Sequence, residues 1–86
     1  MKKTRVVFKT MEGEIIALFP DIHWNTRNGQ ITCYTTKEQH HGADSDLLNT
    51  LPTPNETEYQ PLLKEIADIY YNEELIPTTW GKDATT

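Results

Sequence analysis

Apolar and polar positions alternate along the first third of the chain, a pattern typical of β-strands. Residues 4–10 alternate in this way, and residues 14–19 follow with apolar side chains on both sides. A strand that is apolar on both sides is typical of the interior of a sheet. Gly13 lies between the two segments and can adopt the positive φ that a tight reversal requires. The pattern predicts a β-hairpin whose second strand ends at Pro20, because proline cannot donate to a sheet ladder.

Residues 20–29 lose the alternation and end in an Asn-Gly pair, which is a strong turn signal. A short strand over residues 22–26 would fit the spacing, but the pattern favours an excursion that ends in a turn. Residues 30–36 resume a clean alternation and predict a third strand. Three consecutive strands are expected to form an antiparallel meander.

One helix is predicted in the second half of the chain. Its apolar side chains recur at the spacing of a single helix face: Tyr59, Leu62, Leu63, Ile66, Ile69 and Tyr70. Three residues are followed at the third position by Glu or Gln, the spacing of a capping box: Thr53, Asn55 and Thr57. Pro61 argues against a start at Thr53, because proline deep inside a helix removes a hydrogen bond and clashes with the preceding turn. The helix is therefore expected to begin at Asn55 or Thr57.

The remaining segments complete a small α+β domain. Residues 46–51 fit one short helical turn, and residues 73–80 fit a final strand that Pro77 restricts to a sheet edge or ends early. The predicted fold is β-β-β-α-β, with a three-stranded antiparallel meander, one helix packed on one sheet face and a short C-terminal edge strand. Residues 1–80 are expected to form this single domain, and residues 81–86 a flexible C-terminal tail.

A single helix can cover only one face of the predicted sheet. The opposite face is expected to carry four side chains that must be buried: Val7, Ile16, Leu18 and Tyr34. Their cover could come from residues 20–29, from residues 40–52 or from another chain. A partner is thus one of the solutions that the pattern leaves open.

Composition and charge narrow the class of protein. Hydrophobic residues make up 36% of the 86 positions, enough for one small folded domain and too many for a disordered chain. The net charge of −5 divides into +3 over residues 1–37 and −8 over residues 38–86. Nucleic-acid binding relies on clustered positive charge, so this balance argues against nucleic acid as the main ligand. The acidic second half is better suited to a protein surface.

The sequence also bears on location. The N-terminus lacks the apolar region of a signal peptide, and no run reaches the ~18 apolar residues that would span a bilayer. Cys33 is the single cysteine, so the chain can form neither an internal disulfide nor a cysteine-based zinc cage. We therefore expect a soluble cytoplasmic protein with no membrane contact and no cofactor.

Residues 36–46 hold the densest group of side chains that could bind a ligand or catalyse a reaction, with two adjacent histidines and three acids. A candidate recognition loop is formed by Gln39, His40, His41 and Asp44. Adjacent histidines on an extended chain point to opposite sides, whereas a metal site needs its ligands on one face. The segment is therefore expected to be a connecting loop with a recognition role and no metal.

Catalytic groups are not expected. Cys33 with His40 or His41 suggests a nucleophile and its base. However, Cys33 shares a strand side with Ile31, where a free cysteine usually packs as a small hydrophobe. The paired acids of the chain lack an apolar cleft that would raise a carboxyl pKa. The prediction is a protein that is not an enzyme.

The strand and helix periodicities do not account for three aromatic residues: Trp24, Tyr71 and Trp80. Such residues either close the open end of a small core or anchor a partner. The lean core favours the first role for the two tryptophans. Together the three residues form a candidate partner surface.

Several short motifs resemble an uncharacterised family of short proteins from gut-type bacteria, their phages and mobile elements. The resemblance covers about residues 5–76 and rests on four residue pairs: Phe19 with Pro20, Cys33 with Tyr34, Gln39 with His40, and Glu58 with Tyr59. Two positions depart from the pattern, because Glu38 stands where glycine often precedes the Gln-His pair and Pro61 interrupts the helix. The resemblance implies the fold, a bacterial host cell and a phage or mobile-element context. It implies no reaction.

Three hypotheses about function follow. The leading one is a non-enzymatic small accessory protein that acts by protein–protein interaction, with a protein partner or as a homodimer. The second is a metal- or small-ligand-binding module centred on His40, His41 and Asp44. The third is weak nucleic-acid binding along the basic N-terminal strand, through Lys2, Lys3, Arg5 and Lys9.

Overall fold

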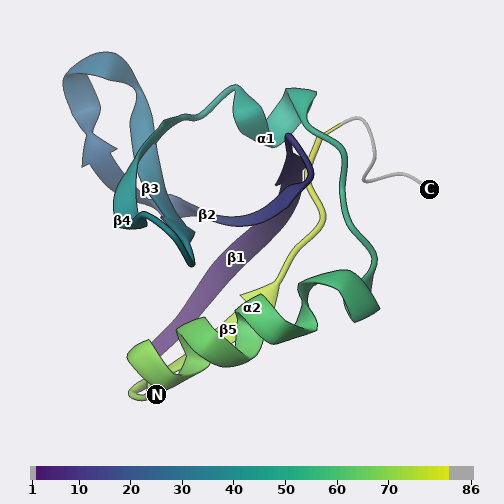
Figure 1. Ribbon diagram of the computed structural model, residues 1–86. Coiled ribbons are helices and arrows are strands. Elements are labelled where there is room, and N and C mark those ends of the chain that lie inside the picture. The colour runs from purple at the N-terminus through teal and green to yellow at the C-terminus, as the bar shows by residue number, and fades with distance from the viewer. Residues whose placement is uncertain (1, 82–86) are drawn as a thin grey trace.

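Within residues 2–81, which the computed structural model describes, five strands form one mixed sheet with a long helix across one face (Figure 1). The elements are β1 (Lys2–Met11), β2 (Glu14–Asn25), the 3₁₀ turn η1 (Thr26–Asn28), β3 (Gln30–Thr35), β4 (Gln39–Asp44), α1 (Leu47–Thr50), α2 (Glu56–Ile69) and β5 (Glu73–Pro77). The strand order is β4-β3-β2-β1-β5, and only the β1–β5 pair of the described sheet is parallel. The predicted α+β class and the helix packed on the sheet are confirmed.

The predicted hairpin of β1 and β2 is also confirmed. Met11 pairs with Glu14, and the two residues between them, Glu12 and Gly13, have φ values of 53° and 80°. A two-residue turn with positive φ at both positions follows the right-handed twist of the flanking strands. Gly13 adopts this conformation without the steric penalty that a β-carbon brings.

Strand β2 continues past Pro20 to Asn25, so the expected end at Pro20 is wrong, and the alternative of a strand over residues 22–26 is closer to the structure. The turn expected at the Asn-Gly pair is confirmed, because η1 spans Thr26–Asn28 and Gly29 follows with a φ of 66°. The pairing of β2 with β1 ends at Leu18, and its register against β3 shifts between Phe19 and His23. Pro20 therefore lies where neither neighbouring strand requires its missing N–H group. The alternation is lost there because the strand is irregular, and the chain stays extended.

A fourth strand of the meander, β4, replaces the connecting loop expected over residues 36–46. Residues 36–38 make the turn, and Gln39 follows with a φ of 60°. β4 then pairs antiparallel to β3 along its full length. The meander therefore has four strands instead of three. Because β4 is an edge strand with polar side chains on both faces, its hydropathy carries no alternation that would reveal it.

Helix α2 begins at one of the two expected positions. Asn55 is the N-cap, and its side chain accepts a hydrogen bond from the Glu58 N–H while the Glu58 carboxylate accepts one from the Asn55 N–H. The face toward the sheet carries the predicted stripe: Tyr59, Leu62, Leu63, Ile66 and Tyr70. Ile69 is 42% exposed, so its expected place in the stripe is wrong. No helix within residues 2–81 is long and apolar enough to cross a lipid bilayer.

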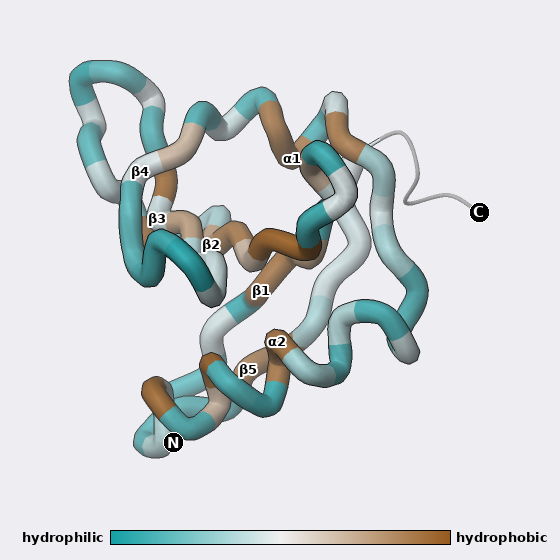
Figure 2. The backbone as a smooth tube through the Cα atoms, in the orientation of Figure 1, coloured by the Kyte–Doolittle hydropathy of each residue, from teal (hydrophilic) through white to brown (hydrophobic). Residues whose placement is uncertain are grey.

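The second face of the sheet is closed by the chain itself. Val7, Ile16 and Leu18 lie on it as expected, and they are covered from outside by Leu47, Leu48, Leu51 and Trp80. Tyr34 lies on the α2 face instead, because its neighbour Cys33 occupies the second face and side chains alternate along a strand. Figure 2 shows apolar stretches of β1 and β2 in the middle of the molecule and further ones at α1, on the opposite side of these strands from α2. A second chain is not needed to bury this face.

Strand β5 lies at the opposite edge of the sheet from β4, as the expected C-terminal edge strand. It runs parallel to β1 because α2 carries the chain back to the end of the sheet at which β1 begins (Figure 1). Pro77 ends the strand, and the next residue, Thr78, donates its N–H to the Val6 carbonyl at 2.8 Å. The tail predicted for residues 81–86 lies outside the described residues apart from Gly81.

Candidate interaction edge at strand β4

The outer backbone of β4 faces away from the sheet. Successive residues in an antiparallel ladder turn their N–H and C=O groups alternately to the two sides. The tight β1–β2 turn makes Met11 and Glu14 a hydrogen-bonded pair, and the registers carry this alternation across the sheet. They leave three residues of β4 with backbone groups that point outward: His40, Gly42 and Asp44. No strand of the described chain pairs with this side.

Hydrogen bonds outside the ladders agree with this alternation. Thr10 donates its N–H to the Pro52 carbonyl at 2.9 Å, on the side of β1 that faces away from β2. Ser45 donates its N–H to the Gly29 carbonyl at 3.3 Å. This bond continues the alternation in which every second residue of β4 bonds toward β3. The same alternation turns the backbone N–H and C=O groups of His40, Gly42 and Asp44 away from β3.

The side chains of β4 divide between the two sheet faces. His40 lies opposite Tyr34 on the α2 face, and His41 lies opposite Cys33 on the second face. The two histidines therefore cannot ligate one metal ion together in this conformation. Within residues 2–81 there is no cluster of three or more side chains suited to hold a metal.

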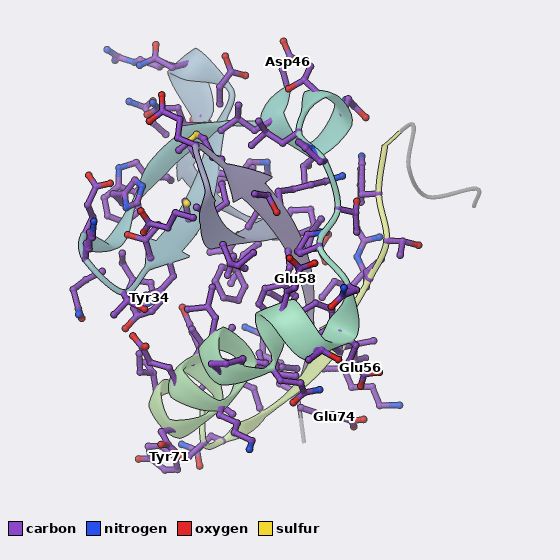
Figure 3. The ribbon with its side chains drawn as sticks, turned by 45° about the vertical axis from the view of Figure 1, so that its right-hand side comes forward. Tyr34, Asp46, Glu56, Glu58, Tyr71 and Glu74 are labelled. Carbon is purple, nitrogen blue, oxygen red and sulfur yellow. The ribbon has the colours of Figure 1, made fainter. Side chains whose placement is uncertain are left out.

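His40 is held against the helix side by aromatic side chains. Its Nε2 lies 2.6 Å from the Tyr70 hydroxyl, and its ring stands edge-on to the rings of Tyr34 and Tyr70. The Tyr34 hydroxyl, which points toward α2 in Figure 3, donates to Glu65 at 2.5 Å and thereby has its pKa raised. Thr36 donates to the other carboxylate oxygen of Glu65 at 3.0 Å. These contacts fasten the β3–β4 hairpin to α2 and fix the position of the edge.

Trp24 lies directly on the centre of β4. Its indole packs so closely over Gly42 that a β-carbon at position 42 would collide with the ring. The side chain is nevertheless 51% exposed. The structure thus brings a residue of the predicted partner surface onto the predicted recognition segment. Sequence reasoning missed Gly42, although a glycine among strand residues can mark such a close approach.

The remaining polar groups of β4 make local contacts. Nδ1 of His41 lies 3.1 Å from the Gln39 carbonyl, and the Asp44 carboxylate accepts a hydrogen bond from the Asp46 N–H at 2.9 Å. The Asp44 contact shapes the chain just before α1. These bonds leave the outward backbone groups of the strand unaffected.

The other two members of the predicted partner surface lie elsewhere. Tyr71 is 76% exposed just beyond the end of α2 (Figure 3), and no described hydrogen bond or ring contact joins it to β4. Trp80 packs on the second face, where the Arg5 guanidinium lies 5.1 Å from the centre of its ring. Trp80 therefore contributes to the cover of the core, the role that the lean composition favoured.

The groups that suggested catalysis are poorly placed for it. Cys33 is buried, and the loss of water around its thiol raises its pKa to about 12. Such a thiol holds almost no thiolate near neutral pH, and the thiolate is the nucleophile. Two pockets of about 210 and 400 Å³ flank α2, and neither is lined by Cys33, His40 or His41.

The four basic residues of the N-terminal strand do not form a common surface. Lys9 is fully buried, and its ammonium donates hydrogen bonds inside the protein. Arg5 makes a bidentate ion pair with Asp21 at 2.7 and 2.8 Å, which lowers the pKa of that carboxyl. The other two lysines lie beside Glu73 and Glu74 in the β1–β5 register. The positive charge of the strand is thus largely matched within the chain.

No known protein-family model, curated protein or solved structure matches this chain. Likeness to a characterised protein therefore contributes nothing to a functional assignment. We infer function from the open edge of β4 and the side chains around it.

Proposed function

We propose that this protein is a small non-enzymatic accessory protein that acts by protein–protein interaction through the edge of β4. The partner supplies an extended strand that continues the sheet, and Trp24 contacts that strand from the α2 side. The observation that carries the proposal is an open strand edge with a half-exposed tryptophan seated at its centre. Main-chain hydrogen bonds provide the affinity in this mode, and the aromatic side chain anchors the partner.

The choice of an edge over a face follows from the packing. Both faces of the sheet are covered by elements of the same chain. Of the two edges, β5 carries Glu73 and Glu74 and ends at Pro77, which are features that discourage pairing with another strand. β4 contains neither lysine nor proline. Its one acidic residue, Asp44, lies at the end of the strand, so β4 carries less of this protection than β5 does.

The two alternative functions have weaker support. A metal or small-ligand site at His40 and His41 requires side chains that converge, and these two lie on opposite faces. Nucleic-acid binding along β1 requires free cationic groups, and Lys9 and Arg5 are engaged inside the chain. The proposal includes a cytoplasmic role in a bacterial host of a phage or mobile element, which the motif resemblance supports.

A capture experiment tests the interaction and its position together. Tagged protein is recovered from bacterial cells that co-express an untagged copy, and mass spectrometry identifies the polypeptides that are held. We expect wild type and Tyr71→Ala to hold the same polypeptide, and Trp24→Ala to lose it, because Trp24 packs on Gly42 of β4 and Tyr71 lies beyond the end of α2. Tyr71 is a matched control, since it is an exposed aromatic residue away from β4.

Other outcomes of this experiment would count against the proposal. Loss with Tyr71→Ala and retention with Trp24→Ala would move the site to the end of α2. If wild type holds neither a host protein nor the untagged copy, the interaction itself is contradicted. Melting temperatures of the variants verify that each remains folded.

A further inference from the structure

We propose that the strand added to β4 is the β4 strand of a second copy of this chain, paired antiparallel about a two-fold axis at Gly42. The inference rests on the proposed function, because it requires β4 to be an interaction edge. It goes further by naming the partner and the register. The product is a symmetric dimer with one sheet that runs continuously through both copies.

The outward backbone groups restrict the register. A hydrogen-bonded antiparallel pair joins two residues that both point toward the partner strand. In β4 these are His40, Gly42 and Asp44, as the strand registers establish. Centring the axis on Gly42 pairs Gly42 with its own copy and pairs His40 with Asp44 of the second copy, so that all three outward residues are used. A shift of the axis to position 41 or 43 leaves one of the outward residues without a matching partner.

The side chains that would face each other favour the same register. It places each His40 opposite Asp44 of the second copy, on the same sheet face, at both ends of the paired segment. An imidazole N–H can donate a hydrogen bond to a carboxylate that faces it across two strands, whereas two like charges in directly facing positions destabilise a ladder. Asp44 is the one acidic residue of β4, and this register keeps the two Asp44 carboxylates apart. Two copies that each carry a net charge of −5 meet here at an edge with little negative charge.

Trp24 and Gly42 explain why the axis lies at position 42. Gly42 has no side chain, and the indole of Trp24 occupies the space where a β-carbon would lie. Because a two-fold axis perpendicular to the sheet keeps both copies on the same face, the two Trp24 rings meet above the axis. Each ring is 51% exposed in the single chain and would be covered by its counterpart. The half-exposed tryptophan thereby gains the cover that it lacks in the monomer.

Charge reversal with rescue tests the register by sedimentation equilibrium over a concentration series. His40→Glu faces Asp44 of the second copy with a like charge at two symmetric positions. We expect dimerisation to weaken by about tenfold or more relative to wild type. In the double variant His40→Glu/Asp44→Lys the two facing side chains carry opposite charges, and we expect dimerisation to recover. Circular dichroism and melting temperature verify folding, because His40→Glu also removes the contact with Tyr70.

A cysteine experiment tests the register without using His40. In the proposed pairing, His41 faces Ala43 of the second copy at a non-hydrogen-bonded position, where α-carbons lie about 4.5 Å apart, within the range that a disulfide spans. Both variants carry Cys33→Ala, since Cys33 lies opposite His41 in its own chain. Mixed His41→Cys and Ala43→Cys proteins should cross-link under mild oxidation, whereas each protein alone should cross-link poorly.

Each contrary result has a definite meaning. A wild-type chain that stays monomeric up to millimolar concentration overturns the dimer. A dimer that persists in His40→Glu, or that the second substitution does not restore, overturns the register, as does cross-linking of His41→Cys with itself. If capture recovers only another protein, in a manner that depends on Trp24, the edge function stands and the second copy is excluded as its partner. If capture recovers neither another protein nor the untagged copy, both proposals fail.

Discussion

At the scale of single residues, Lys9 is the buried side chain that most needs hydrogen-bond acceptors inside the protein. Its side chain has no exposed surface, yet Nζ donates to the Thr53 hydroxyl at 2.9 Å and to the Trp80 carbonyl at 2.6 Å. A buried charge destabilises a fold unless such partners replace its water. Lys9 therefore ties together β1, the segment before α2 and the C-terminal segment that covers the second face.

Removal of the Thr53 hydroxyl should weaken the fold. Thr53→Val keeps the shape of the side chain but leaves the buried ammonium with one acceptor fewer. We expect the free energy of unfolding to fall by about 1.5–3 kcal/mol, the range for a hydrogen bond to a charged group. Urea denaturation measures this change. Thr57→Val, at an exposed position of α2, is the control and should change stability by less than half as much.

The two histidines of β4 show which side-chain features local geometry can predict and which it cannot. The opposite orientation of His40 and His41 follows from local geometry alone and holds in the structure. That His40 reaches Tyr70, thirty residues along the chain, depends on how α2 packs, and no local pattern contains that information.

At the scale of elements, α2 shows how a local signal selects among competing starts. Three residues have capping-box spacing in the sequence. At the start of α2, Asn55 forms the box, because its side chain and that of Glu58 each accept a hydrogen bond from the backbone N–H of the other residue. The choice places Pro61 inside the helix, where it is tolerated because the apolar stripe continues to pack on the sheet.

Substitution of the cap tests this assignment. Asn55→Ala removes the side-chain acceptor for the Glu58 N–H, and we expect a loss of about 1 kcal/mol in the free energy of unfolding. Thr57→Ala alters the rival start, which lies inside the first turn of the helix, and should have little effect or a small stabilising one. Urea unfolding midpoints compare the two. An equal loss in both variants would contradict a cap at Asn55.

Strand β4 is the element whose prediction failed, for a physical reason. An edge strand contacts only one neighbour and needs no apolar face of its own, so polar side chains are tolerated on both sides. Its strand conformation comes from pairing with β3 after the turn at residues 36–38. The polar composition therefore indicated a loop, although the segment forms a strand that pairs with β3.

At the scale of the whole molecule, the acid–base groups of the core set an alkaline limit to stability. Burial raises the pKa of Cys33 to about 12 from its ordinary value of 9.0. The hydrogen bond with Glu65 raises the pKa of Tyr34, and burial raises those of Tyr59 and Tyr70. In every case the folded protein favours the neutral, protonated form.

This arrangement predicts the direction of the pH dependence. A pKa that is higher in the folded state stabilises the protein below the unfolded pKa, and that stabilisation is lost as the pH rises toward the folded value. For Cys33 the loss begins near pH 9.0 and reaches a slope of up to about 1.4 kcal/mol per pH unit. We expect urea midpoints to be lower at about pH 11 than at about pH 8.

Variants separate the contributions to the alkaline loss. Cys33→Ala and Tyr34→Phe should each flatten the decline, because each removes one group with a raised pKa. A midpoint that stays constant over this interval in wild type would contradict the raised values. Measurement at a fixed ionic strength keeps the general charge repulsion of an acidic protein comparable between samples.

The sequence by itself determined the features that depend on neighbours along the chain. Periodicity alone identified the first hairpin, the third strand, the stripe of α2 and the closing edge strand, because strand and helix spacings are imposed by backbone geometry. The turn glycine at position 13 and the effect of Pro77 on the closing strand are equally local, since each depends on the conformational limits of one residue type. Capping-box spacing and Pro61 narrowed the start of α2 to Asn55 or Thr57 in the same way.

Only the tertiary structure decided the features that join distant segments. The cover of the second face by α1 and Trp80, the buried Lys9 and the contact of Trp24 with Gly42 all depend on which surfaces remain free after the sheet has formed. The conformation of β4 belongs to the same group, because a polar segment becomes a strand when a neighbour offers it hydrogen bonds. Local preferences specify the shape of each element, whereas burial and pairing between elements determine where they meet, and the candidate edge lies at one of those meetings.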